Sequence, residues 1–86
     1  MTSLIYSPEA TAEVRAIHDW YERESAGLGR ALLEDLRIAE EAIARSPFAF
    51  RVIRRETRRY LLARFPYQLL FTVRKDTVVI VACLHA

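Results

Sequence analysis

The stretch RRYLLARFPYQLLFTVRKDTVVIVACLHA, residues 58–86, decides the fold, because it holds three successive runs of strand-forming residues. RRYLLARF, YQLLFTV and TVVIVACL are rich in β-branched, aromatic and leucine side chains, which favour strands. Phe65-Pro66 separates the first two runs, and RKDT at 74–77 predicts a tight turn between the last two. In the second run, alternate residues form one apolar face: Tyr67, Leu69, Phe71 and Val73. The last run is apolar on both faces, which predicts a central or well-covered strand.

The N-terminal half begins with SLIY at 3–6, a short run that predicts a first strand. SPEA follows and favours the start of a helix, because Ser7 caps free backbone N–H groups, Pro8 suits the first helical position and Glu9 complements the positive end. Apolar residues then recur at helical spacing as far as about Ser25: Ala10, Val14, Ile17 and Tyr21. The glycines of AGLG predict a tight break after this helix.

A second helix is predicted from about Leu28 to Arg45, where SPF ends it because a residue before proline disfavours helix. Its buried stripe is Leu32, Leu36, Ala39 and Ile43, and its expected outer side is Glu34, Asp35, Arg37, Glu40 and Glu41. The short connection predicts an antiparallel helical hairpin. We therefore expect an α+β fold in the order β-α-α-β-β-β, with the hairpin packed on a mainly antiparallel four-stranded sheet and residues 1–86 forming one domain.

Composition narrows the class of protein. With 52% hydrophobic and 28% charged residues, the 86-residue chain is typical of a globular protein. Its longest apolar run, Val78 to Leu84, is far shorter than a membrane span, and the N-terminus lacks the pattern of a secretory signal. A single cysteine, Cys83, fits a cytoplasmic location. His18, His85 and Cys83 have no metal-binding spacing, and no nucleotide-binding motif occurs, so we expect no metal and no cofactor.

The charge is divided unequally along the chain. Residues 1–50 hold five arginines and nine acidic residues, hence −4, whereas residues 51–75 hold eight basic residues and one acidic residue, hence +7. Guanidinium groups match carboxylates and phosphates, and tyrosines can stack on a base or pack against a partner. This region is a solvated sheet edge, a nucleic-acid surface or a surface for an acidic peptide. The candidate binding residues are Arg51, Arg54, Arg55, Arg58, Arg59, Tyr60, Arg64, Tyr67 and Arg74.

His85 is a second candidate, because it ends the last predicted strand and has a side chain suited to proton transfer. No evident acid or second base accompanies it in the sequence, so the residues by themselves favour a structural or terminal histidine.

The ordered combination of these features resembles the RelE/ParE superfamily of toxins from type II toxin–antitoxin systems. The resemblance lies in the first strand with SPEA opening a helix, the helical hairpin, and the arginine-rich strand followed by RFPY and an apolar strand ending in histidine. It covers essentially the whole chain. It implies a toxin neutralised by an antitoxin whose acidic C-terminal segment wraps around it, in a heterotetramer or a larger assembly.

The resemblance is closer to the ParE-like, plasmid-stabilisation branch, whose members act on DNA gyrase, because Lys75 is the only lysine and lies in a predicted turn. It therefore implies growth inhibition without enzymatic activity. The alternative is a RelE-like, ribosome-dependent mRNA endonuclease that would use Arg58, Arg64, Tyr67 and His85. A further alternative is a non-toxic module that only binds the antitoxin. Family members usually continue beyond the position of His85, whereas this sequence ends at Ala86.

Overall fold

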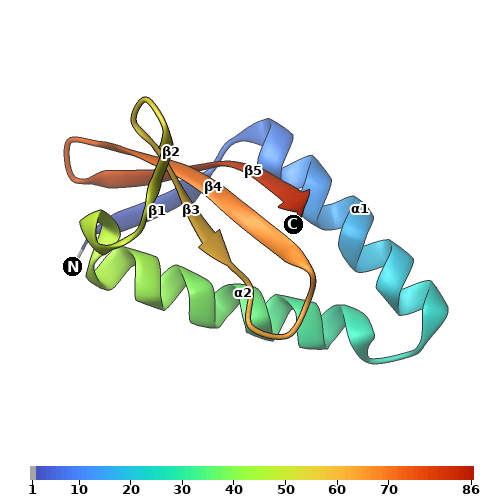
Figure 1. The fold of residues 1–86 in the computed structure, drawn as a ribbon. Coiled ribbons are helices and arrows are strands. Elements are labelled where there is room, and N and C mark those ends of the chain that lie inside the picture. The colour runs from blue at the N-terminus through green and yellow to red at the C-terminus, as the bar shows by residue number, and fades with distance from the viewer. Residues whose placement is uncertain (1) are drawn as a thin grey trace.

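The computed structural model describes residues 2–86 and contains two helices packed on a five-stranded sheet (Figure 1). The sheet has the strand order β1-β5-β4-β3-β2, in which β1 pairs with β5 in parallel and every other pairing is antiparallel. In chain order the elements are β1 (Ser3–Tyr6), α1 (Pro8–Glu24), α2 (Leu28–Arg45), the 3-10 turn η1 (Pro47–Ala49), β2 (Val52–Arg54), β3 (Thr57–Leu61), β4 (Tyr67–Arg74) and β5 (Thr77–His85).

The start of α1 follows the predicted cap. The Ser7 side-chain oxygen accepts a hydrogen bond from the Ala10 backbone N–H at 3.1 Å, and Pro8 occupies the first helical position, where its missing N–H costs nothing. Ala10 is completely buried, and Val14 and Ile17 pack against the same core. The predicted apolar face of the first helix is therefore confirmed.

The connection between the helices depends on two glycines and one carboxylate. Gly27 has a φ of 94°, in the left-handed region that favours glycine. The Glu22 carboxylate accepts hydrogen bonds from the Gly27 N–H at 3.1 Å and from the Gly29 N–H at 2.9 Å. A Cβ on Gly29 would lie 2.6 Å from His18 Nε2, so this glycine allows the two helices to approach closely.

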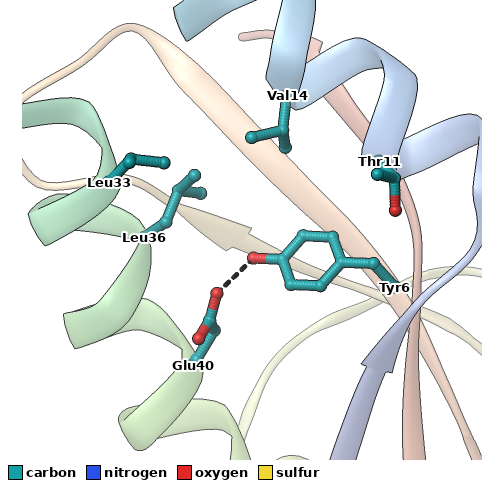
Figure 2. A pocket seen from close by; sticks show the side chains of 6 residues that line it. All are labelled: Tyr6, Thr11, Val14, Leu33, Leu36 and Glu40. Carbon is teal, nitrogen blue, oxygen red and sulfur yellow. Dashed lines mark hydrogen bonds between the residues drawn. The ribbon is translucent and has the colours of Figure 1, made fainter. Parts of the chain in front are cut away.

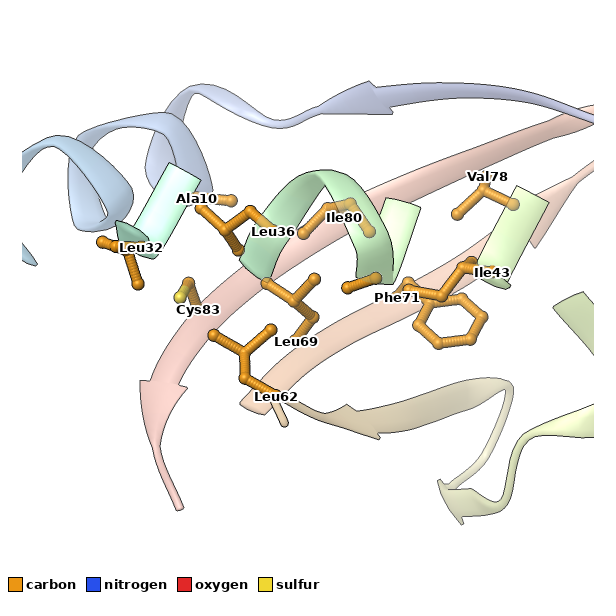
Figure 3. Close-up of a cluster of buried hydrophobic side chains, with 11 residues drawn as sticks. Ala10, Leu32, Leu36, Ile43, Leu62, Leu69, Phe71, Val78, Ile80 and Cys83 are labelled. Atoms are coloured by element: carbon orange, nitrogen blue, oxygen red, sulfur yellow. The ribbon is translucent and has the colours of Figure 1, made fainter. Parts of the chain in front are cut away.

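The core lies between the helices and one face of the sheet (Figure 3). The predicted stripe of α2 is confirmed, because Leu32, Leu36, Ala39 and Ile43 are all buried. The sheet contributes alternate residues of its two long strands, Leu69 and Phe71 from β4 and Val78 and Ile80 from β5. After a shift in the β4–β5 register, Cys83 of β5 is buried on the same side. Each fully buried large side chain contributes roughly 1.5–3 kcal/mol of transfer free energy. The predicted α+β class, element order and helical hairpin are therefore confirmed.

Three details of the prediction are wrong. The sheet has five strands instead of four, because the three-residue strand β2 precedes the strand that holds Arg58. That following strand, β3, ends at Leu61, so Arg64 lies in the bend before β4. Asp35 was expected on the outer side of α2, but its exposed fraction is 2%. Within residues 2–86, neither helix has the length and apolar character of a membrane span.

Candidate protein-interaction surfaces

A groove runs between α1 and α2 (Figure 2). One hollow of the groove has a volume of about 230 Å³ and is lined by Tyr6, Thr11, Val14, Leu33, Leu36 and Glu40. A second hollow of about 280 Å³ shares Thr11, Val14 and Leu33 with it and extends to His18. Leu33 is 48% exposed, so a large aliphatic side chain in the groove faces solvent. A groove of this kind suits the apolar face of an amphipathic helix.

The groove is polar at both ends. At one end the Tyr6 hydroxyl donates a hydrogen bond to Glu40 Oε2 at 2.6 Å, so Glu40 takes part in the groove, contrary to the expected solvated face (Figure 2). Burial and the neighbouring Glu40 carboxylate raise the pKa of the Tyr6 phenol far above its usual value. Tyr6 therefore remains a donor throughout the physiological pH range. At the other end, Arg15 lines one adjoining hollow, and Arg30 and Glu22 line another, so the basic groups of the groove lie away from Glu40.

Arg58, one of the predicted binding residues, has a structural role. One of its guanidinium nitrogens donates hydrogen bonds to the backbone oxygens of Phe50 at 2.7 Å and Phe48 at 3.3 Å. Its guanidinium carbon lies 5.1 Å from the centre of the Phe48 ring, within the range of a cation–π interaction. Arg58 therefore connects η1 to β3, which leaves less of its hydrogen-bonding capacity for a partner.

The neighbouring residues of β3 face opposite sides of the sheet. Tyr60 opposes the buried Leu69 and packs against Phe50 with ring centroids 5.4 Å apart, so its ring contributes to the core. Arg59 opposes Leu70 and lies on the side away from the helices. Arg58 and Tyr60 therefore lie on one side of β3 and Arg59 on the other, so the two arginines have different surroundings.

Four other arginines gather at one end of the molecule. Arg51, Arg54 and Arg55 lie in and around β2 and are exposed, and Arg74 lies at the end of β4 near the β4–β5 turn (Figure 1). Among residues 2–86, Arg74 is the only one of the four with a carboxylate partner, since one of its guanidinium nitrogens lies 3.6 Å from Glu56 Oε2. Both side chains of that pair are largely exposed, so the pair itself contributes little to stability.

Tyr67 and His85 lie at a different place, where β4 begins and β5 ends. They are register partners, and their ring centroids are 5.2 Å apart. The Tyr67 ring also lies 6.4 Å from that of Tyr21 on α1. Burial raises the pKa of the Tyr67 phenol above its usual value, so this hydroxyl is not an activated base.

The position of Arg64 depends on Asp35. Asp35 Oδ2 accepts hydrogen bonds from the backbone N–H groups of Arg64 at 2.9 Å and Phe65 at 3.2 Å, which fixes the bend before β4. The sequence prediction missed this residue, although its spacing contained a signal. Asp35 lies three residues after Leu32 and directly before Leu36, within the buried stripe of α2.

The structure brings together only part of the predicted nuclease set. Tyr67 and His85 are adjacent, whereas Arg58 opposes Phe71, four residues further along β4. At about 3.3 Å per strand residue this separates Arg58 from Tyr67 by roughly 13 Å along the strand. Across residues 2–86 no three His, Cys, Asp or Glu side chains are grouped closely enough to hold a metal ion.

Comparison with solved structures concerns the fold. The fold matches a chain described as "Chromosomal ParDE TA system from P. aeruginosa" with a TM-score of 0.86, covering 100% of this chain and 97% of that chain. The two sequences are 19% identical, so this likeness concerns the fold. A search of curated protein sequences gives no significant match.

The family follows from the sequence. The family model described as "ParE toxin of type II toxin-antitoxin system, parDE" matches residues 4–86. The chain therefore belongs to the ParE toxin family, and the predicted ParE-like branch of the superfamily is confirmed.

Proposed function

We propose that this protein is a growth-inhibiting toxin that acts on DNA gyrase in the cytoplasm and is neutralised by a cognate antitoxin. The match to the ParE toxin family over residues 4–86 carries the proposal. The antitoxin is the second component that a toxin of a type II system requires. The helix groove and the basic surfaces support the two interactions that the proposal needs.

The groove between α1 and α2 supports the interaction with the antitoxin. Its floor is apolar, formed by Val14, Leu33 and Leu36, and two of its hollows extend along α1 from Thr11 to His18. Placing an apolar helix stripe there would remove Leu33 from water, and each square ångström of buried apolar surface contributes about 25 cal/mol. Acidic residues of the antitoxin would be favoured near Arg15 and Arg30, which line the hollows that adjoin the groove.

The arrangement of the candidate nuclease residues favours gyrase inhibition over mRNA cleavage. Attack of a 2′-hydroxyl on phosphate needs a base, an acid and a cationic group within reach of one phosphate. Arg58 is hydrogen-bonded to two backbone oxygens and lies far along the strand from Tyr67 and His85. Tyr67 and His85 are close to each other, and this contact is the observation that favours mRNA cleavage as the alternative function.

The experiment is a supercoiling assay with purified gyrase, toxin and antitoxin. We expect micromolar toxin to inhibit supercoiling and an equimolar amount of antitoxin to restore it. Leu33→Glu, in the groove, is expected to inhibit gyrase normally but to need at least about tenfold more antitoxin for relief. Ile38→Glu is the matched control, because Ile38 is also exposed on α2 (44%) and does not line the groove.

Normal supercoiling in the presence of micromolar wild-type toxin would contradict the proposal. New cleavage sites in translated mRNA after induction, mapped by primer extension, would favour the ribonuclease instead.

A further inference from the structure

Large apolar side chains are exposed next to the arginines at the η1–β2 end of the molecule. Phe48 is 68% exposed, Val52 44% and Ile53 42%, and these three residues lie within six positions of the chain. Phe48 and Val52 line a hollow of about 170 Å³ together with Arg55, Glu56, Arg58 and Val73. Single exposed apolar residues are common, but a group of them around a hollow is typical of an interaction site. We refer to Phe48, Val52, Ile53 and Arg55 as the η1–β2 patch.

Internal contacts hold the patch in position. Arg58 contacts the backbone oxygens of Phe48 and Phe50 and lies against the Phe48 ring, so the exposed aromatic side chain rests on a fixed support. Phe50 in turn packs against Phe71, which is completely buried. A surface that is already ordered loses less conformational entropy when a partner binds.

The charge around the patch indicates the chemistry of a partner. No carboxylate pairs with Arg51, Arg54 or Arg55 in the described part of the chain. The backbone of Arg55 has a φ of 50°, in the left-handed region that is unfavourable for residues other than glycine. Three exposed guanidinium groups beside an apolar hollow are complementary to carboxylates that flank an apolar side chain.

A protein segment fits these features better than a nucleic acid. Phosphates would engage the arginines, but Val52 and Ile53 offer neither hydrogen bonds nor an aromatic face for a base. One face of Phe48 is already covered by the Arg58 guanidinium. An aliphatic or aromatic side chain of a protein partner would fill the hollow and bury all three apolar residues.

We propose that the η1–β2 patch binds the target protein of this toxin, through an acidic segment that inserts an apolar side chain into the hollow. This inference rests on the proposed function in one respect, namely that the toxin acts on a protein. The lining of the η1–β2 hollow shares no residue with the three hollows along the helix groove, so the target and the antitoxin contact different parts of the molecule. An antitoxin bound in the groove would then prevent target binding either by its size or by a segment that extends beyond the groove.

The test compares two patch variants with one control. Arg55→Glu reverses a charge of the patch, and Val52→Ser removes an apolar side chain from the lining of the hollow. The control, Arg23→Glu, makes the same charge change as Arg55→Glu at an exposed arginine at the end of α1. Each patch variant is expected to need at least about tenfold more toxin for half-maximal gyrase inhibition, because hot-spot contacts have effects of this size. The affinity for antitoxin should remain within about twofold of the wild type for all three variants, which also shows that they are folded.

Growth arrest after induction provides a readout that does not depend on gyrase. If the wild type arrests growth without inhibiting gyrase, the proposed function fails, and weaker arrest by both patch variants still supports this inference. Wild-type potency of both patch variants would overturn it, as would a wild type that inhibits neither gyrase nor growth.

Loss of antitoxin binding with unchanged inhibition would assign the patch to the antitoxin. Loss of binding to RNA or duplex DNA by Arg55→Glu, with unchanged inhibition by Val52→Ser, would assign it to nucleic acid.

Discussion

Asp35 shows how a single buried carboxylate can determine the geometry of a distant loop. Its exposed fraction is 2%, and it accepts hydrogen bonds from the backbone N–H groups of Arg64 and Phe65, which are 29 and 30 residues away in the sequence. A buried carboxylate is costly unless hydrogen bonds compensate for lost solvation, and these two donors compensate part of that cost. The direction of the chain as it enters β4, and with it the position of Tyr67, therefore depends on a side chain of α2.

Asp35→Ala should destabilise the protein by about 2–4 kcal/mol, because two backbone donors lose a charged acceptor and a small cavity forms. Urea unfolding followed by circular dichroism measures this change in the free energy of unfolding. Asp19→Ala is the matched control, since the Asp19 side chain is 55% exposed and is expected to change stability by less than about 1 kcal/mol. Equal destabilisation by the two substitutions would show that the Asp35 carboxylate does not hold the bend.

At the scale of secondary-structure elements, the connection between α1 and α2 shapes the helical hairpin and so the groove. Glu22, in the last turns of α1, accepts hydrogen bonds from Gly27 and Gly29 and thereby satisfies N–H groups at the start of α2. Negative charge near a helix N-terminus is also favourable. The hydrogen bonds from Gly27 and then Gly29 lower the pKa of the Glu22 carboxyl below its usual value.

This lowered pKa predicts a pH-dependent contribution to stability. Because the folded-state pKa lies below the unfolded value of about 4.3, the contribution is present above that value and disappears as the pH falls through the folded-state pKa. The melting temperature of Glu22→Gln should therefore be lower than that of the wild type at pH 7, and the two should converge as the pH approaches 3.

Glu24→Gln serves as the control for this comparison, because Glu24 is exposed at the end of the same helix. A difference between wild type and Glu22→Gln that stays constant from pH 7 to pH 3 would rule out the carboxylate as the cause.

At the scale of the whole molecule, the sheet separates a core side from an arginine-bearing edge. The helices and alternate strand residues bury Phe71, Val78 and Ile80 completely. At one end of the molecule, β2 with its flanking residues and the β4–β5 turn carry exposed basic residues; Figure 1 shows where these elements lie. Cys83 lies on the core side of β5 with an exposed fraction of 3%, and its backbone N–H donates to Glu13 Oε1 on α1 at 2.8 Å. Burial, followed by the nearby Glu13 carboxylate, raises the pKa of the Cys83 thiol to about 11.

Cys83 should consequently report unfolding of the whole molecule. At pH 8 the folded thiol is almost fully protonated and covered, whereas an unfolded cysteine with a pKa near 8.5 is partly ionised and reactive. Labelling with a disulfide reagent should be slow in buffer and should accelerate with urea over the same range as the loss of circular dichroism. Rapid, complete labelling in the absence of urea would mean that β5 opens locally.

Local patterns in the sequence predict much of this fold. The cap at Ser7, the helix from Leu28 to Arg45 and the alternation along β4 depend on residues a few positions apart, and the structure confirms all three. Strand β2 was not predicted, because three exposed residues have no distinctive pattern and form a strand only by pairing with β3. The structural role of Arg58 was also missed, because its hydrogen-bond acceptors are backbone oxygens whose positions depend on the turn at η1.

Local sequence patterns were enough to predict the two amphipathic helices, the antiparallel pairing of the later strands and the concentration of positive charge in residues 51–75. Periodicity, turn residues and charge are properties of neighbouring residues. Tertiary structure alone decided the parallel pairing of β1 with β5, the groove between the helices and the different surroundings of the arginines. These features depend on sheet register and helix packing, which bring together residues that are far apart in the chain. For this reason one run of arginines contains both a structural support, Arg58, and exposed groups that remain available to a partner.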